Sequence, residues 1–277
     1  ETFFFPKSAD RDFVLKAVTE FLLHDKKKNF GRAALRWPQI IATAYPWMQT
    51  WSLQDMLLAL VARTLHHRAM GRSWLDVVEY FAGTANLSRA AIQKGHRVCA
   101  LDKDISESHD VMGSVESIRL WLSVLAATKE HALVWHGTPC SSWTIMCRAV
   151  SERCESNNWL GNDRPFVTEG NTLADLSGLT IFLAYMMNCI PGLEQSGSSV
   201  MGKSPCLKGV LTFIMAIWVK TYHGCFGGNS EKPLQLWSSS SWIEDLARSK
   251  PDMGGSGVGL VSKSEDGSFT GIKDKLK

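Results

Sequence analysis

The sequence predicts an α/β protein whose mostly parallel sheet follows a helical N-terminal extension and ends in a C-terminal antiparallel hairpin. Residues 74–101 have the pattern of strand, helix and strand, and about thirty residues is the length of one βαβ unit. Residues 115–135 add a helix and a strand, and such alternation is typical of a parallel sheet with helices on both faces. Near the C-terminus, Gly227–Ser230 separates two apolar segments and has the composition of a hairpin turn.

The apolar positions before residue 71 recur at helical spacing. They form two runs: Val14, Ala17, Val18, Phe21 and Leu22, then Leu53, Met56, Leu57, Leu60 and Val61. Ser52 is positioned to cap the second run, and Pro38 and Pro46 interrupt the chain between the two. We therefore expect residues 1–70 to form a helical N-terminal extension.

Strands and helices alternate from residue 71 to residue 246. The predicted strands are residues 74–80, 98–101, 132–135, a short segment around 193–194, 222–226 and 234–238. The predicted helices are residues 87–94, 115–127, one that ends near 187, and 207–219. We expect a polar loop over 141–171 and a disordered tail over 247–277, which is rich in Gly, Ser and charge. Together these elements predict a Rossmann-like domain over residues 71–246.

The composition is that of a folded globular protein. Hydrophobic residues make up 45% of the chain and charged residues 21%, close to the globular average. The net charge of +3 is small and the basic residues are scattered, so charge neither requires nor excludes a polyanionic partner. No apolar stretch approaches the ~20 residues that span a bilayer, so we expect no membrane segment.

The seven cysteines are an odd number and include no Cys-x-x-Cys pair. Cys140, Cys147 and Cys154 are seven residues apart, unlike the short spacing of a structural zinc site. We therefore expect reduced thiols, an intracellular protein and no metal. Because the chain begins with Glu1 rather than Met, the sequence leaves the natural N-terminus and any targeting segment open.

The strongest chemical signal lies where the first predicted strand turns into a helix. In the segment Glu79–Leu87, Gly83 permits close backbone approach, and the helix that follows offers unpaired N–H groups to a polar ligand. Asp102 ends the next strand, 19 positions (102 − 83) after Gly83, where an acidic residue can bind ribose hydroxyls. The segment lacks the further glycines of a dinucleotide fingerprint, which favours a nucleoside cofactor without pyrophosphate. An ordinary turn with a solvent-facing Asp is the alternative.

Two further segments follow predicted strands. Pro139 and Cys140 come after the strand at 132–135, at the edge of a parallel sheet where catalytic groups gather. A thiol there can act as a nucleophile if its surroundings favour the thiolate, or it can be an inert packing residue. Glu194 stands at the next predicted strand end, where it either meets the same cleft or lies exposed on the surface.

Taken together, these segments resemble the cytosine-5 DNA methyltransferases, a family within the class I S-adenosylmethionine-dependent methyltransferases. The resemblance covers residues 74–240 and is carried by Phe81-Ala82-Gly83, Asp102, Pro139-Cys140 and Leu193-Glu194-Gln195. The Pro-Cys pair is the most discriminating element, because adenine-N6 methyltransferases have an Asp or Asn followed by two prolines and an aromatic residue. That pattern is absent from this sequence.

The resemblance implies that S-adenosyl-L-methionine is the cofactor. It implies these cofactor-binding residues: Phe81, Ala82, Gly83, Asn86, Leu87 and Asp102. It implies that the Cys140 thiolate adds to C6 of a flipped-out cytosine while Glu194 binds the N3 edge. The partner is then DNA or RNA, and the compartment is the nucleus if the protein is a DNA methyltransferase of a eukaryote.

This sequence also departs from the family pattern. Gln195 stands where the family has Asn, the acidic residue that the family places near the position of Ser114 is missing, with Glu116 a weak substitute, and no Gln-x-Arg-x-Arg segment occurs. In the residues that follow the last predicted strand we expect no target-recognition domain. Two alternatives therefore stay open: a catalytically inactive cofactor- or nucleic-acid-binding module of the same fold, and a small-molecule methyltransferase.

Overall fold

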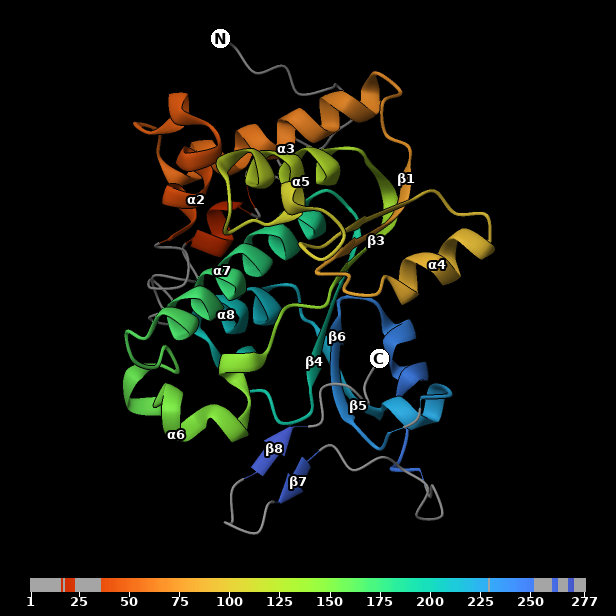
Figure 1. The fold of residues 1–277 in the computed structure, drawn as a ribbon. Helices are drawn as coiled ribbons and strands as arrows, with labels where there is room; N and C mark the ends of the chain where they lie inside the picture. The colour runs from red at the N-terminus through yellow and green to blue at the C-terminus, as the bar shows by residue number, and fades with distance from the viewer. Residues whose placement is uncertain are drawn as a thin grey trace.

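The fold was analysed in a computed structural model (Figure 1). The structure describes residues 16, 18–22, 36–228 and 230–251, and the backbone of 261–263 and 269–271. The helix start predicted at Val14 and Ala17, the turn residue Asn229 and most of the predicted disordered tail lie outside these residues.

A six-stranded mixed sheet forms the centre of the protein. Its strands are β1 (Leu75–Tyr80), β2 (Val98–Leu101), β3 (Thr128–His136), β4 (Ile190–Ser196), β5 (Ile217–Tyr222) and β6 (Pro233–Ser238), in the order β2-β1-β3-β4-β6-β5. The first four strands in this order are parallel, and β6 is antiparallel to both of its neighbours. This arrangement confirms the predicted α/β class with a mostly parallel sheet and a C-terminal antiparallel hairpin.

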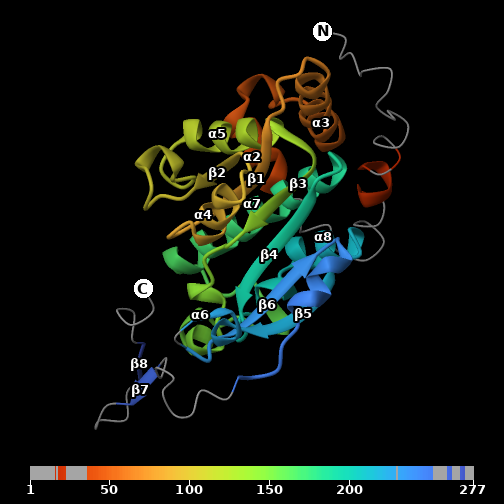
Figure 2. The same cartoon turned by 90° about the vertical axis from the view of Figure 1, so that its right-hand side faces the viewer.

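Helices cover both faces of the sheet unequally (Figures 1 and 2). On one face lie α2 (Trp37–Ala44), α3 (Leu53–Ala69), α5 (Val115–Ala126), α7 (Pro165–Met186) and α8 (Pro205–Phe213). On the other lie α4 (Asn86–Gln93) and the 3-10 helix η9 (Ser241–Leu246). Strand β1 is buried along nearly its whole length, as expected for a strand in a parallel sheet covered on both sides.

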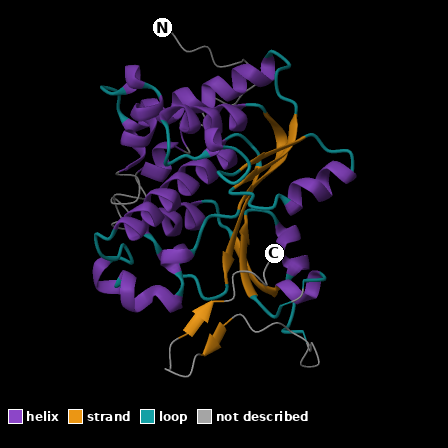
Figure 3. Cartoon of the chain, viewed as in Figure 1, coloured by secondary structure: helices purple, strands orange, loops and turns teal. Residues whose placement is uncertain are grey.

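Shorter helical turns occupy the connections. They are η2 (Pro46–Met48), η3 (Glu107–His109), η4 (Ser141–Trp143), η5 (Ile145–Cys147), α6 (Arg148–Ser151), η6 (Glu155–Asn157), η7 (Met201–Lys203) and η8 (His223–Phe226). A separate antiparallel pair, β7 (Val261–Lys263) and β8 (Phe269–Gly271), lies in the predicted tail (Figure 3). The sequence pattern did not predict this pair.

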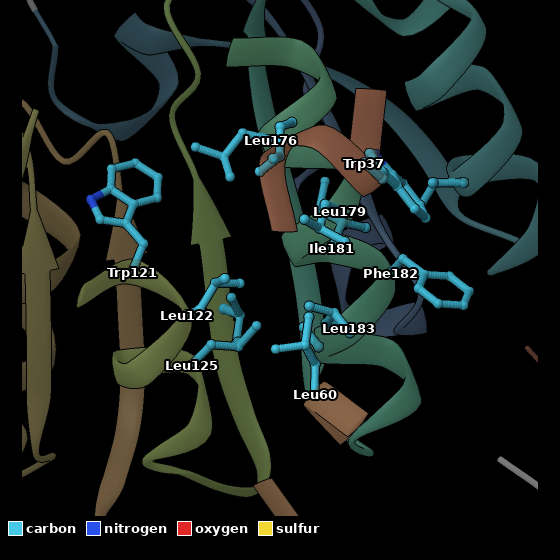
Figure 4. Close-up of a cluster of buried hydrophobic side chains, with 14 of the residues drawn as sticks. Trp37, Leu60, Trp121, Leu122, Leu125, Leu176, Leu179, Ile181, Phe182 and Leu183 are labelled. Carbon is cyan, nitrogen blue, oxygen red and sulfur yellow. The ribbon is translucent and has the colours of Figure 1, made fainter. Parts of the chain in front are cut away.

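The main hydrophobic core lies between the sheet and the larger helical layer (Figure 4). Trp37 of α2 and Leu60 of α3 pack in the same cluster as Leu125 of α5 and Phe182 of α7. Helices α2 and α3 therefore share one hydrophobic core with the sheet. Ser52 caps α3 as predicted, since its Oγ accepts the Asp55 N–H at 3.1 Å.

The prediction of a polar loop over 141–171 was wrong. This segment contains η4, η5, α6 and η6, and α7 begins at Pro165, where the fixed φ of proline suits a first helical position. Gly170 and Asn171 are poor helix formers, yet both are buried inside α7 by the segment packed against them. Tertiary contacts here outweigh local propensity.

The prediction of one helix over 207–219 was also wrong. Helix α8 ends at Phe213, and Met215 adopts a left-handed conformation with φ of 50°. From Ile217 the chain is strand β5, in which Val219 is buried and Trp218 is exposed. The strand predicted at 222–226 is instead the 3-10 helix η8. Within the described residues no helix is long and apolar enough to cross a membrane.

Candidate functional site

The four parallel strands end at one edge of the sheet, and the loops that follow them touch one another there. The backbone N–H of Gly137, just after β3, donates to the Tyr80 carbonyl at the end of β1 at 2.9 Å. A Cβ at Gly137 would lie 2.9 Å from the Phe81 carbonyl oxygen. The two loops therefore approach so closely that the position requires glycine.

The turn between β1 and α4 is held by a buried carboxylate. Glu79 accepts hydrogen bonds from the Ser88 backbone N–H at 2.8 Å and from the Ser88 hydroxyl at 2.5 Å. Phe81, Gly83 and Ala85 in this turn all have left-handed backbone conformations, with φ between 53° and 57°. Left-handed conformations are uncommon for residues other than glycine, so the fixed ends of the turn must hold them in place.

The structure brings together the predicted pair Gly83 and Asp102. The Gly83 N–H donates to Asp102 Oδ2 at 2.9 Å, and the Asp104 N–H donates to Asp102 Oδ1 at 2.8 Å. Gly83 is exposed, and nothing lies within 4 Å of the position of a Cβ there. Because a carboxylate can accept about four hydrogen bonds, Asp102 is oriented by the backbone and keeps lone pairs for a ligand.

The electrostatics of this turn disfavour an anionic ligand. A helix N-terminus ordinarily attracts phosphate through its unpaired N–H groups. At α4 the Glu79 carboxylate already takes the Ser88 N–H, and Asp102 adds a second negative charge beside Gly83. A neutral or cationic ligand is therefore favoured over a pyrophosphate.

The other predicted cofactor residues have mixed surroundings. Ala82 lies in the turn, and its N–H donates to the Leu101 carbonyl at 3.2 Å. Phe81 packs edge-on against Trp121, with ring centroids 4.6 Å apart. Asn86 is exposed at the start of α4, whereas Leu87 packs into the small hydrophobic cluster on that face of the sheet.

Cys140 lies in the loop after β3, directly before η4. It is half-buried, and its carbonyl accepts the Trp143 N–H at 2.8 Å. Among the described residues, its thiol has no hydrogen-bond partner. Asp102 and Cys140 follow parallel strands that are both neighbours of β1, so they lie at the same edge of the sheet.

Gln195 joins the Cys140 segment to β4. Its side chain is buried, with Nε2 donating to the Thr138 carbonyl at 2.8 Å and Oε1 accepting the Ser199 hydroxyl at 2.9 Å. The Thr138 hydroxyl also bonds to the Ser177 hydroxyl of α7 at 2.7 Å. Gln235 of β6 donates to the carbonyls around Ser199 and fixes the loop after β4.

Glu194 points to the opposite face of the sheet from Gln195. Its cross-strand partner, Leu236, belongs to the small cluster around Trp135, and directly opposite residues share a face. Burial raises the pKa of Glu194, while Lys232 and His223 nearby act to lower it. Both predicted catalytic residues lie at this edge of the sheet, and the described residues show no hydrogen bond between them.

His136 is a buried residue of this region that the sequence pattern did not single out. Its ring nitrogens bond to the Gly192 carbonyl at 3.1 Å and to the Thr180 hydroxyl at 2.8 Å. Burial lowers its pKa to about 4, so the ring is neutral at physiological pH. It ties β3 to β4 and α7 and leaves no nitrogen for a ligand.

Within the described residues no group of three or more His, Cys, Asp or Glu side chains is placed to hold a metal ion. No family model matches this sequence, and no curated protein matches it at a significant level. The case for function therefore depends on the geometry of the sheet edge.

Proposed function

We propose that this protein is an S-adenosylmethionine-dependent methyltransferase that modifies a nucleic-acid base through Cys140. The observation that carries the proposal is the shared sheet edge, where the Gly83–Asp102 pair and the Cys140 segment lie in adjoining loops. A parallel sheet that ends in an antiparallel hairpin adds support by analogy, because it is more typical of methyltransferases than of dehydrogenases.

The residues at the β1–α4 turn fit S-adenosylmethionine. The open space at Gly83 admits a ligand, and the free lone pairs of Asp102 suit the hydroxyls of a ribose. The two carboxylates, Glu79 and Asp102, suit a cofactor that carries positive charge and no phosphate. The residues that would hold it are Phe81, Ala82, Gly83, Asn86 and Asp102, with Leu87 supporting the turn. When bound, the cofactor supplies a methyl group from its positively charged sulfur.

Cys140 would supply covalent catalysis. Its thiolate adds to C6 of a cytosine ring, forming a C–S bond and moving electron density to C5. After C5 has been methylated, a base removes the C5 proton, the C–S bond breaks and the thiolate is restored. A protonated Glu194, favoured by its raised pKa, would donate to ring N3 and stabilise the charge that develops.

Covalent trapping tests this proposal directly. A 5-fluorocytosine oligonucleotide is incubated with the protein and S-adenosylmethionine, and the adduct is located by mass spectrometry. We expect an adduct on Cys140 that Cys140→Ser abolishes and Cys147→Ser preserves. Calorimetry should give the same S-adenosylmethionine affinity for all three proteins, because the thiol acts after cofactor binding.

The outcomes separate the alternatives. A wild-type protein that binds no S-adenosylmethionine contradicts the proposal altogether. Cofactor binding without an adduct on either DNA or RNA contradicts the base chemistry and leaves a small-molecule methyltransferase or an inactive binding module.

A further inference from the structure

Arg153 is buried in the segment that follows Cys140. Its side chain is 1% exposed, and all of its N–H donors have acceptors. The acceptors are the Ser142 carbonyl at 2.8 Å, the Ser142 hydroxyl at 2.9 Å, the Trp159 carbonyl at 2.7 Å, the Asn171 side-chain oxygen at 2.7 Å and the Val167 carbonyl at 3.1 Å. One guanidinium thus joins η4, the loop at 159 and the first turns of α7.

Every one of these acceptors is neutral. Among the described residues Arg153 forms no ion pair with a carboxylate, and its guanidinium carbon lies over the ring of Trp143, 3.3 Å from the ring centroid. Burial lowers the pKa of Arg153 to about 10. A buried charge without an opposite charge costs stability, and such costs are typical of positions retained for function.

The contacts of Arg153 lie on one side of Cys140, and those of Gln195 lie on the other. Arg153 holds both the backbone and the side chain of Ser142, two residues after Cys140. Gln195 and Ser177 hold Thr138, two residues before it. The segment 138–142 is therefore fixed at both ends. Cys140 lies at its centre, and among the described residues its thiol has no hydrogen-bond partner.

Helix α7 packs against η4 and helps to hold the segment 138–142 in place. The Trp143 indole N–H donates to the Gly170 carbonyl at 3.1 Å, and a Cβ at Gly170 would lie 2.2 Å from the Ser142 hydroxyl oxygen. These contacts fix the position of η4 against α7.

We propose that Arg153 is a positioning residue that fixes the Cys140 thiol at the sheet edge. The inference rests on the proposed role of Cys140 as the nucleophile. Only the planar five-donor fork of arginine can hold these acceptors at once, whereas lysine has three donors on a single nitrogen. Lysine at this position keeps the positive charge but cannot donate to all of these acceptors at once.

The test compares Arg153→Lys with the matched variant Arg68→Lys. Arg68 is also largely buried, and it also donates to carbonyl groups. These are the carbonyls of Thr128 at 3.0 Å and Lys129 at 2.9 Å, which lie near the start of β3, at the edge of the sheet opposite to Cys140. Two quantities are measured at one pH in the native proteins. The first is the rate of iodoacetamide alkylation at Cys140 relative to Cys147, and the second is the rate of adduct formation with the 5-fluorocytosine oligonucleotide.

We expect Arg153→Lys to raise the relative alkylation of Cys140 by about threefold, because local opening exposes a half-buried thiol. Adduct formation should fall by about tenfold or more, because a misplaced nucleophile loses its orientation. Arg68→Lys should lower the melting temperature and change neither quantity. Ser142→Ala, which removes one acceptor of Arg153, should raise alkylation less than Arg153→Lys and serves if Arg153→Lys does not fold.

Equal alkylation ratios in wild type, Arg153→Lys and Ser142→Ala would overturn the inference, as would an equal change in Arg68→Lys. Failure of the proposed function is a separate result: if wild type forms no adduct, the alkylation ratio alone still decides whether Arg153 positions Cys140.

Discussion

The two faces of the sheet differ in how they are covered. The face beneath α2, α3, α5, α7 and α8 packs against a large continuous cluster of buried side chains. The face beneath α4 and η9 has a small cluster, with Trp135, Val219, Leu234, Leu236 and Ile243 as its buried members. Glu79, which is buried, and Glu194, which is partly buried, both lie on the thinly covered face. The comparison indicates that one face supplies stability while the other has room for charged groups.

The largest expected effect is on the thickly covered face. Phe182 is fully buried and packs against the rings of Phe21 and Trp37 at 4.5 and 5.6 Å. Phe182→Ala should lower the free energy of unfolding by about 3–5 kcal/mol, through lost contacts and the cavity that remains. Urea unfolding measures this loss, and a loss below about 1 kcal/mol would show that the thick layer is not the main source of stability.

On the thinly covered face, Leu236→Ala should cost less, about 2–3 kcal/mol, because a small cluster near the surface can collapse into the space. Leu236 is 4% exposed and lies opposite Glu194 on β6. The same urea titration compares it with Phe182→Ala. A loss as large as that of Phe182→Ala would remove the energetic distinction between the faces.

The thickly covered side also contains a buried carboxyl group, that of Asp175 in α7. Burial raises the pKa of Asp175 in α7 to about 7, although Arg36 lies 3.6 Å away. An unfolded Asp titrates near pH 3.9, so the folded protein favours the protonated acid. This contribution to stability is fully present below about pH 4 and is lost as the pH rises through 7.

Between pH 5.5 and 8.5 the Asp175 contribution should fall by about 2 kcal/mol, because each pKa unit is worth about 1.4 kcal/mol. Asp175→Asn removes the titrating group and should remove this part of the pH dependence. Unfolding titrations of both proteins at the two pH values measure the difference. Parallel pH dependence in the two proteins would show that Asp175 titrates normally.

The smallest expected effect is on binding at the sheet edge. Asp102→Ala should weaken S-adenosylmethionine binding by about tenfold, the equivalent of about 1.4 kcal/mol. Asp102 is partly exposed, so the melting temperature should change little. Calorimetry gives the affinity, with Asp104→Ala as the matched control, because Asp104 contacts Asp102 through its backbone only. Equal affinity in wild type and Asp102→Ala would show that Asp102 stabilises the turn and does not bind the cofactor.

The sequence predicted the β1–α4–β2 unit within a residue or two because its signals are local. A strand with two consecutive valines, a glycine turn and a glycine after the helix all lie within thirty residues. The start of α7 could not be predicted, because Gly170 is kept helical by Trp143 and Ser142, which lie far from it in the sequence. Strand β5 was missed because a short apolar run fits a helix and a strand equally well.

Part of the geometry of the candidate site could be predicted for the same reason. Gly83 and Asp102 are joined by a hydrogen bond, as their place in one βαβ unit suggested. Strand alternation alone puts Glu194 and Gln195 on opposite faces, but which face meets the Cys140 loop depends on how the helices are layered. Arg153 was missed because its role is visible only when α7 and η4 are seen together.

Gly192 restricts which residues can replace Trp135 during evolution. A Cβ there would lie 2.2 Å from the indole ring of Trp135, so the ring occupies the space that a side chain at this position would fill. We therefore expect Gly192 and Trp135 to change together during evolution. In any homologue with a larger residue at the position of Gly192, we expect a smaller one at the position of Trp135.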